Sequence, residues 1–150
     1  MEISEFGKPF WGKCAQMGVR MLDDRVLERD SIELPTQPIP LFRGEHPDEG
    51  GAPGDIIGRI EHVWYGDESG LQVIYFDGHF LKKHEDYLSE YPRHRQPAMT
   101  ADRVEAPAML ITHARLQSVT LVEFGAWMGS GSTFIFDSPL PEMLSKRGRM

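Results

Sequence analysis

The sequence predicts a mainly β domain with one main helix, built as a small β-barrel or as two packed antiparallel sheets. Three observations predict it. Short runs rich in β-branched and aromatic residues recur along the chain, several of them alternating between apolar and polar positions. Eleven Pro and 15 Gly punctuate these runs, as a many-stranded fold requires. Only one segment has clear helical spacing, and 150 residues with a 40% hydrophobic fraction suit one compact domain.

The N-terminal region is expected to form an arm followed by a hairpin. Residues 1–16 hold three aromatic side chains among Gly and Pro, and they are Phe6, Phe10 and Trp11. This composition predicts an arm that docks by its aromatics. Residues 17–27 contain two apolar runs on either side of the Asp23–Asp24 pair, which favours a turn. The main domain is therefore expected to cover 17–137 and to open with a β-hairpin.

A proline-rich segment and a long loop come next. Residues 33–42 contain three prolines, Pro35, Pro38 and Pro40. Proline cannot donate to a β-ladder, so this segment is predicted to be extended and to lie at a sheet edge. The run GEHPDEGGAPGD over 44–55 is the richest loop signal in the chain.

The most regular pattern predicts an antiparallel hairpin. Residues 56–65 alternate, with one face expected to hold Ile56, Gly58, Ile60, His62 and Trp64. GDESG at 66–70 predicts the turn, and 71–76 the returning strand.

The remaining elements are one helix and several short strands. Residues 81–91 place apolar side chains at helical spacing, and Pro92 ends the pattern. Strands are predicted near 98–103, 109–113 and 116–124, with a further one at 133–136. The last segment, 138–150, is predicted to be a tail.

Charge and composition exclude several classes of function. A net charge of −7 argues against nucleic acid as the main partner, because nucleic-acid binders gather Lys and Arg on one face. The single Cys14 cannot form an internal disulfide or a Cys-based zinc site, and no motif for a metal, phosphate or dinucleotide is present. We therefore expect no cofactor and no metal. No apolar run approaches the roughly 18 residues of a membrane helix, so we expect a soluble protein without a membrane partner.

Six segments in order resemble one protease family. They are PFWGKCAQMGVRMLDDR (9–25), LPTQPIPLFRGEH (34–46), IIGRIEHVW (56–64), YFDG (75–78), AMTAD (98–102) and ARLQSVTLVEFGAW (114–127). Together they are similar to the capsid maturation (prohead) proteases of tailed phages, which are relatives in fold of the herpesvirus assemblins. The resemblance implies a protease-like β fold and a site with a histidine base and a serine nucleophile.

The resemblance places two catalytic candidates on this chain. The family's histidine follows a Pro-rich segment and precedes an iGRI strand, which corresponds here to His46. The family's nucleophile strand reads like G-V-S-V-D, and Thr100 stands where that serine would be. A threonine hydroxyl can attack a carbonyl, but its β-methyl restricts χ1 and crowds the approach. As alternatives, His46 can be a solvated loop histidine and Thr100 an ordinary strand threonine.

Two residues compete for the third catalytic position. The assemblins use a second histidine on a later strand, which implies His113. Glu123 shares an alternating face with apolar neighbours and is the rival, because an inward carboxylate needs a cationic partner. Both can instead be structural.

The chain departs from the family pattern in three places. It has Thr100 in place of the serine, Gly125 in place of the family's proline, and a longer loop around His46. These departures favour a phage head protein with little or no peptidase activity, such as a decoration, cement or other minor capsid component. Its expected partners are the major capsid protein, other head proteins or a second copy. It would be made in the host cytoplasm and located in the virion. The alternatives are an active maturation protease of the serine/threonine type and an unrelated β-barrel binding module.

Overall fold

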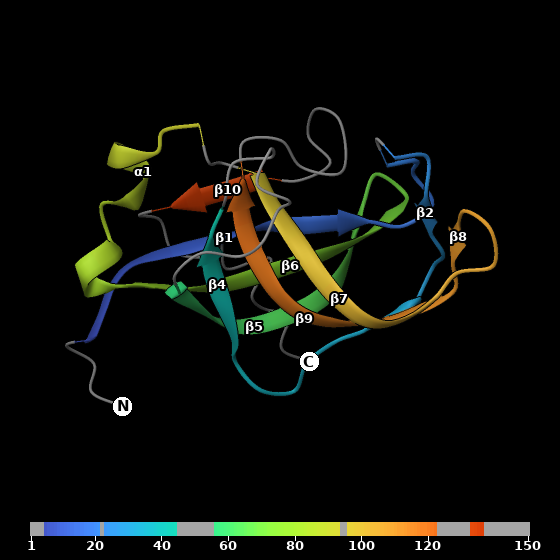
Figure 1. The fold of residues 1–150 in the computed structure, drawn as a ribbon, viewed down its shortest axis with the longest axis horizontal. Coiled ribbons are helices and arrows are strands. Elements are labelled where there is room, and N and C mark those ends of the chain that lie inside the picture. Colours follow the sequence, from blue (N-terminus) through green and yellow to red (C-terminus); the bar gives the residue numbers. More distant parts are fainter. Residues whose placement is uncertain (1–4, 22, 45–55, 94–95, 123–132, 137–150) are drawn as a thin grey trace.

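The predicted mainly β architecture is confirmed. The structure is a computed structural model that describes residues 5–21, 23–44, 56–93, 96–122 and 133–136. Its strands are β1 (Phe6–Gln16), β2 (Val26–Leu27), β3 (Ile32–Glu33), β4 (Ile39–Arg43), β5 (Ile56–Glu68), β6 (Leu71–Leu81), β7 (Gln96–Glu105), β8 (Leu110–Ile111), β9 (His113–Val122) and β10 (Thr133–Phe136). The helical part consists of a 3-10 turn, Lys82–His84, and the short helix α1 (Tyr87–Glu90). Figure 1 shows the strands as arrows, with β7 and β9 crossing over β1 and β6.

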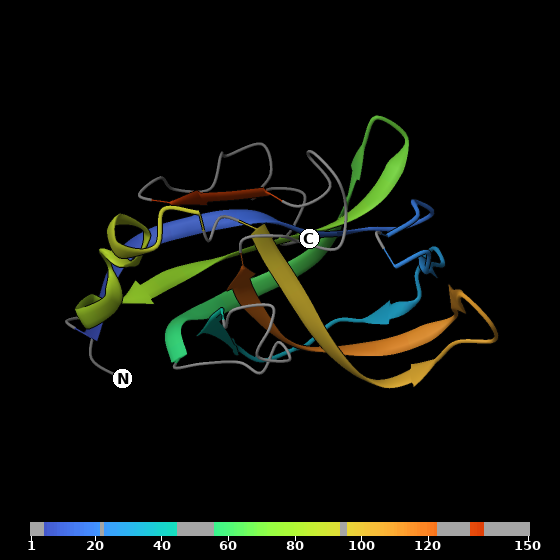
Figure 2. The same cartoon turned by 45° about the horizontal axis from the view of Figure 1, so that its top comes forward.

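The main sheet has the strand order β10-β1-β6-β5-β4-β9, with β3 and β7 also paired to β9. The sheet bends so that β7 and β9 form a layer facing β1 and β6 (Figure 2). Among the described strands no ladder joins β7 to β1 or β10, so the packed-sheet alternative fits this part of the chain and a closed barrel does not. A separate pair, β2 with β8, completes the fold.

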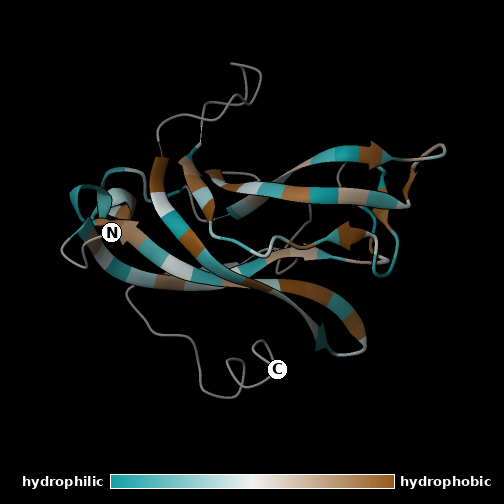
Figure 3. Cartoon of the chain, turned by 90° about the horizontal axis from the view of Figure 1, so that it is seen from below, coloured by the Kyte–Doolittle hydropathy of each residue, from teal (hydrophilic) through white to brown (hydrophobic). Residues whose placement is uncertain are grey.

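The core lies between the two layers. Long strands alternate between hydrophobic and hydrophilic residues (Figure 3), and the hydrophobic positions meet in one large cluster. Its fully buried members come from both layers and include Phe10, Leu41, Ile60, Phe76, Val119 and Leu121. Burial of these side chains is the main driving force for folding.

The sheet is mixed, whereas purely antiparallel sheets were expected. β4 runs antiparallel to β5 but parallel to β9, with Leu41 opposite Val119. Parallel strands need a long connection between them, and here the connection contains β5 to β8. The sequence carries no local signal for the relative direction of two strands that lie so far apart along the chain.

The segment 1–16, expected to be an arm, forms strand β1 from residue 6 onward. β1 pairs with β6 on one side and β10 on the other. Its Phe10 is 1% exposed and packs edge-on against Phe76 and Phe80, with ring centroids 6.1 and 5.1 Å away. The aromatics therefore dock, as expected, but as part of the main sheet.

The proline-rich segment was predicted to lie at an edge, and this is wrong for β4. β4 is hydrogen-bonded between β5 and β9. Pro40 lies opposite Arg59 on the β5 side, while the ladder to β9 begins only at Leu41. The missing N–H of Pro40 therefore falls where the second ladder has not yet started.

The β5–β6 hairpin is confirmed, but the predicted face of β5 changes partway along the strand. A bulge between Ile60 and His62 shifts the register against β6. As a result Ile60 faces the main core, whereas Trp64 joins a smaller cluster on the opposite face with Val73, Tyr75 and Trp11.

Two other local predictions hold only in part. Residues 17–27 do turn back, because the Gly18 N–H donates to the Leu27 carbonyl at 2.8 Å. Among the described residues of this stretch only Val26–Leu27 is a strand, however, and it pairs in parallel with β8 instead of with the first half of the hairpin. The predicted helix 81–91 is split into the 3-10 turn and α1, with Tyr87 and Leu88 buried. No helix among the described residues is long and apolar enough to cross a membrane.

Candidate functional site

The site begins with Thr100, which lies in the middle of β7 on its outer face. Its neighbours Met99 and Ala101 pack against the core, so alternation along the strand turns Thr100 outward. Across the ladder Thr100 lies opposite Ser118 of β9, and Ser118 is 6% exposed. Side chains in such directly opposed positions have Cβ atoms about 4.5–5.5 Å apart. The cross-strand neighbour of the predicted nucleophile is therefore a second hydroxyl residue, which is not a base.

The structure does not bring Thr100 and His113 together. His113 begins β9 and lies opposite Glu105, at the other end of the same ladder. The five residues from His113 to Ser118 correspond to about 16 Å of strand. A base that takes the Thr100 proton must lie within hydrogen-bond reach of it, so His113, which was expected to orient that base, lies too far along the strand to contact it.

The other two predicted catalytic residues, His46 and Glu123, lie outside the described residues. The strands that precede them are described, and they end side by side. Arg43 of β4 is in register with Leu121 of β9. Gly44 approaches β9 so closely that a Cβ at this position would clash with the Leu121 carbonyl oxygen. The close approach explains why glycine stands at the end of β4.

The carboxylate nearest to Thr100 along β7 is held by an arginine. Arg115 donates from Nε to Asp102 Oδ1 at 2.9 Å and from Nη2 to Oδ2 at 2.6 Å, and Gln117 Nε2 adds a longer bond of 3.2 Å. The hydrogen bonds from Arg115 lower the pKa of Asp102, and the same bonds raise the pKa of Arg115. Asp102 is therefore a fixed, ionised partner of Arg115, which makes it a poor proton acceptor for Thr100.

Sequence reasoning missed two histidine–carboxylate pairs on β5 and β6. His62 Nδ1 lies 2.7 Å from Asp77 Oδ1, and His79 Nδ1 lies 2.5 Å from Glu61 Oε1. Each pair joins a strand to its hairpin partner, so the register of the hairpin is the signal that could have found them. The bulge between Ile60 and His62 hides that signal, because it changes which residues share a face.

Arg59 extends the second of these pairs toward the N-terminus of β1. Its Nη2 lies 3.6 Å from Glu61 Oε2, and its guanidinium carbon lies 4.5 Å from the centre of the Phe6 ring. Such cation–π contacts at partly exposed positions stabilise by about 0.5–1 kcal/mol. We therefore assign this group a structural role in joining β1 to the β5–β6 hairpin.

The described part of the chain offers no metal centre, since it contains no cluster of three or more His, Cys, Asp or Glu able to hold an ion. Cys14 is fully buried, and burial raises its pKa to about 12, so it is a neutral thiol and a weak nucleophile. Comparison with known proteins gives no match to a family model, to a curated protein or to a solved structure.

Proposed function

We propose that this chain is a capsid-associated structural protein of a tailed phage, on a scaffold similar to that of the capsid maturation proteases and with little or no peptidase activity. It would act as a decoration, cement or minor head component. One observation carries the proposal. At the predicted nucleophile position Thr100 is paired with Ser118, which is not a base, while His113 lies about 16 Å along the ladder.

The chemistry of this position supports a structural role. A hydroxyl becomes a nucleophile when a base within hydrogen-bond reach takes its proton. Among the described residues no side chain hydrogen-bonds to Thr100, and Asp102 is already bound to Arg115. Threonine also suits an exposed strand position because its branched side chain favours β structure. Thr100 is thus well explained without a catalytic role.

The spatial arrangement of the six resembling segments supports the scaffold. They contribute to β1, β4, β5, β6, β7 and β9. These six strands are consecutive neighbours in the sheet, in the order β1-β6-β5-β4-β9-β7. All six segments therefore contribute to one sheet, as a shared scaffold requires.

An active maturation protease is the second candidate, and one observation favours it. β4 and β9 end side by side, with Gly44 packed on the Leu121 carbonyl. His46 follows Gly44 by two residues, and Glu123 follows Leu121 by two. In this reading Thr100 attacks the peptide carbonyl, His46 is the base, and Glu123 orients it in place of the distant His113.

Binding to assembled shells tests the structural proposal. The chain would be mixed with empty shells of the major capsid protein from the same phage, and bound protein would be measured by co-sedimentation. Saturable binding that is equal for the wild type and Thr100→Ala is expected. A chain that stays in the supernatant at all concentrations would overturn the capsid assignment and favour an unrelated binding module.

A further inference from the structure

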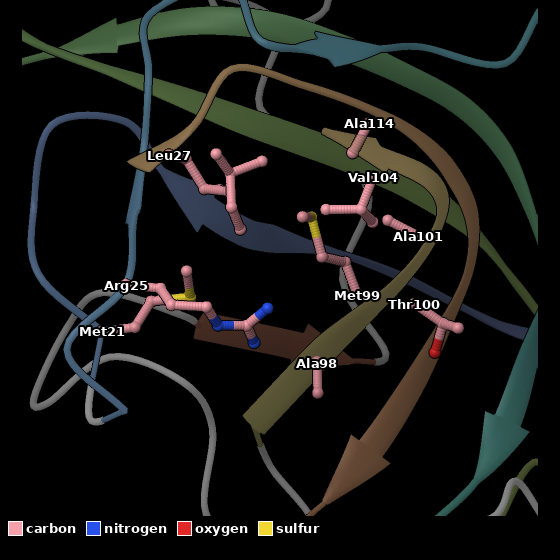
Figure 4. A pocket seen from close by; sticks show the side chains of 10 residues that line it. Met21, Arg25, Leu27, Ala98, Met99, Thr100, Ala101, Val104 and Ala114 are labelled. Carbon is pink, nitrogen blue, oxygen red and sulfur yellow. The ribbon is translucent and has the colours of Figure 1, made fainter. Parts of the chain in front are cut away.

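A pocket of about 310 Å³ opens on the inner face of β7, between that strand and the β2–β8 pair. Its walls are apolar, and they include Met21, Leu27, Met99, Ala101, Val104 and Ile111. Figure 4 shows Met99 pointing into this space and the Thr100 side chain pointing away from it. Thr100 therefore borders the pocket without directing its hydroxyl into it.

One charged residue, Arg25, is among the described residues that line the pocket. Its guanidinium points into the space (Figure 4). Asp23 fixes this orientation, because its Oδ2 accepts from Arg25 Nε at 2.8 Å and lies 2.7 Å from Nη2, while its Oδ1 accepts from the Arg25 backbone N–H at 3.1 Å. The turn 23–25 therefore presents a preset guanidinium to an apolar cavity.

The bonding pattern leaves one edge of the guanidinium for a ligand. A guanidinium carries five N–H donors arranged as two forks. Asp23 uses the fork formed by Nε and Nη2, and among the described residues no other side chain bonds to the Arg25 guanidinium. The second fork is formed by Nη1 and the other Nη2 hydrogen. Its two donors match the two oxygens of a ligand carboxylate.

We infer that this pocket binds an apolar group that carries a carboxylate. The volume equals that of about ten waters, which is enough for one large apolar side chain or a medium-length alkyl chain. The two methionines in the wall, Met21 and Met99, are flexible and can adapt to different apolar shapes. The same chemistry is found in a free alkyl acid and in the C-terminal residue of a protein that ends in Leu, Met or Phe.

The surroundings of the pocket offer apolar surface for more of a bound chain. Val104 at the pocket is 47% exposed, and Met109 and Leu110 beside β2 are 48% and 40% exposed. In a chain with a net charge of −7, an anion needs a local cation to bind, and Arg25 supplies it here.

Methyl NMR of the full chain with ¹³C-labelled methionine tests this inference. The probes are octanoate, octanol, and an acetylated Gly-Gly-Leu-Leu peptide with either a free or an amidated C-terminus. The variants are Arg25→Gln, which removes the fork, and Ala101→Phe, which fills the cavity. Arg20→Gln is the matched control, because Arg20 is a highly exposed arginine on the same turn. Thermal unfolding shows that each variant is folded before it is titrated.

We expect octanoate to shift the Met21 and Met99 methyl signals saturably in the wild type and in Arg20→Gln. Arg25→Gln should weaken binding by about tenfold or more, because a charge-assisted fork is lost. Octanol should bind the wild type as weakly as octanoate binds Arg25→Gln. Ala101→Phe should abolish the shifts.

The peptide probes identify the source of the ligand. If the free peptide binds more tightly than octanoate and the amidated peptide does not, the ligand is a protein C-terminus. If octanoate binds more tightly than the free peptide, the ligand is a free acid. Absence of saturable shifts with every probe, or equal affinity in wild type and folded Arg25→Gln, would overturn the inference.

Discussion

Thr100 of β7 lies directly opposite Ser118 of β9, on the face of the ladder that points away from the core. Thr100 stands where the resembling protease family has its nucleophile serine. Such a cross-strand pair of Thr and Ser stabilises a sheet by about 0.2–1 kcal/mol. It does not by itself supply a base, so the pairing favours a structural interpretation of Thr100.

Replacement of Thr100 should have a small effect on stability. Thr100 is exposed, and strand propensity spans about 1 kcal/mol, so we expect Thr100→Ala to lower the free energy of unfolding by about 0.5–1 kcal/mol. Thr100→Val, which keeps the β-branch and loses the hydroxyl, should be closer to the wild type. Urea denaturation would measure both. A loss above about 3 kcal/mol in either variant would show that the hydroxyl belongs to a tightly coupled buried network.

The N-terminal strand should be essential to the core. Phe10→Ala removes a ring that packs on Phe76 and Phe80, and such truncations cost about 3–5 kcal/mol. Val104→Ala is the matched control, because Val104 is 47% exposed and should cost less than about 1 kcal/mol. Thermal unfolding of the two variants checks the difference. Equal melting temperatures would contradict a core role for β1. They would mean that residues 6–16 form the docked arm expected from the sequence.

Gly44 should tolerate no side chain. A Cβ at this position would meet the Leu121 carbonyl, so Gly44→Ala must separate the ends of β4 and β9 at a cost of about 1–3 kcal/mol. Gly70→Asn is the matched control. A Cβ added at Gly70 would have no atom within 4 Å, and asparagine tolerates the positive φ of 85° at this position. Its cost should stay below about 1 kcal/mol by chemical denaturation. A neutral Gly44→Ala would contradict the close approach of the two strands.

The Lys13–Glu68 ion pair should make stability depend on pH in the acid range. Lys13 Nζ lies 2.7 Å from Glu68 Oε1, and Tyr75 donates to Oε2 at 3.0 Å. The hydrogen bond from Lys13 lowers the pKa of Glu68 below 4.5. Because the folded-state pKa is the lower one, the contribution is full above the unfolded value and is lost as the pH falls through the folded value.

Glu68→Gln measures that contribution. The Lys13 side chain is 3% exposed, so it would lose its charged partner while buried, but Glu68 is 46% exposed and water screens the pair. We therefore expect a loss of about 1–2 kcal/mol near pH 7, below the about 3–5 kcal/mol of a fully buried pair. The difference between wild type and variant should shrink as the pH is lowered to about 3. A difference that is constant from pH 7 to pH 3 would rule out the ion pair as its source.

Local patterns in the sequence predicted the elements whose cause is local. The β5–β6 hairpin follows from alternation on both sides of a turn, and the turn itself contains Gly70 at φ 85°. Ile60 and Trp64 were predicted to share one face, and this was wrong, because one extra residue in a bulge reverses the face of everything after it. Nothing in the local pattern around Glu61 marks that bulge.

Features set by distant contacts could not be read in advance. Phe10 looked like part of an arm because its partners, Phe76 and Phe80, are more than sixty residues away. The same holds for the site. Thr100 was identified from the family resemblance, but its neighbour Ser118 is known only once β7 is paired with β9. The predicted partner His113 was plausible in sequence, and the register alone places it at the far end of the ladder.

The most direct test of the proposed function is the intact mass of the major capsid protein after co-expression with this chain. Shells would be purified from cells that carry the wild type, Thr100→Ala or His46→Ala, and the capsid protein weighed. A structural capsid component predicts one uncut mass that is the same in all three. A shorter capsid protein with the wild type, restored to full length by Thr100→Ala, would contradict this account and identify a threonine-dependent maturation protease.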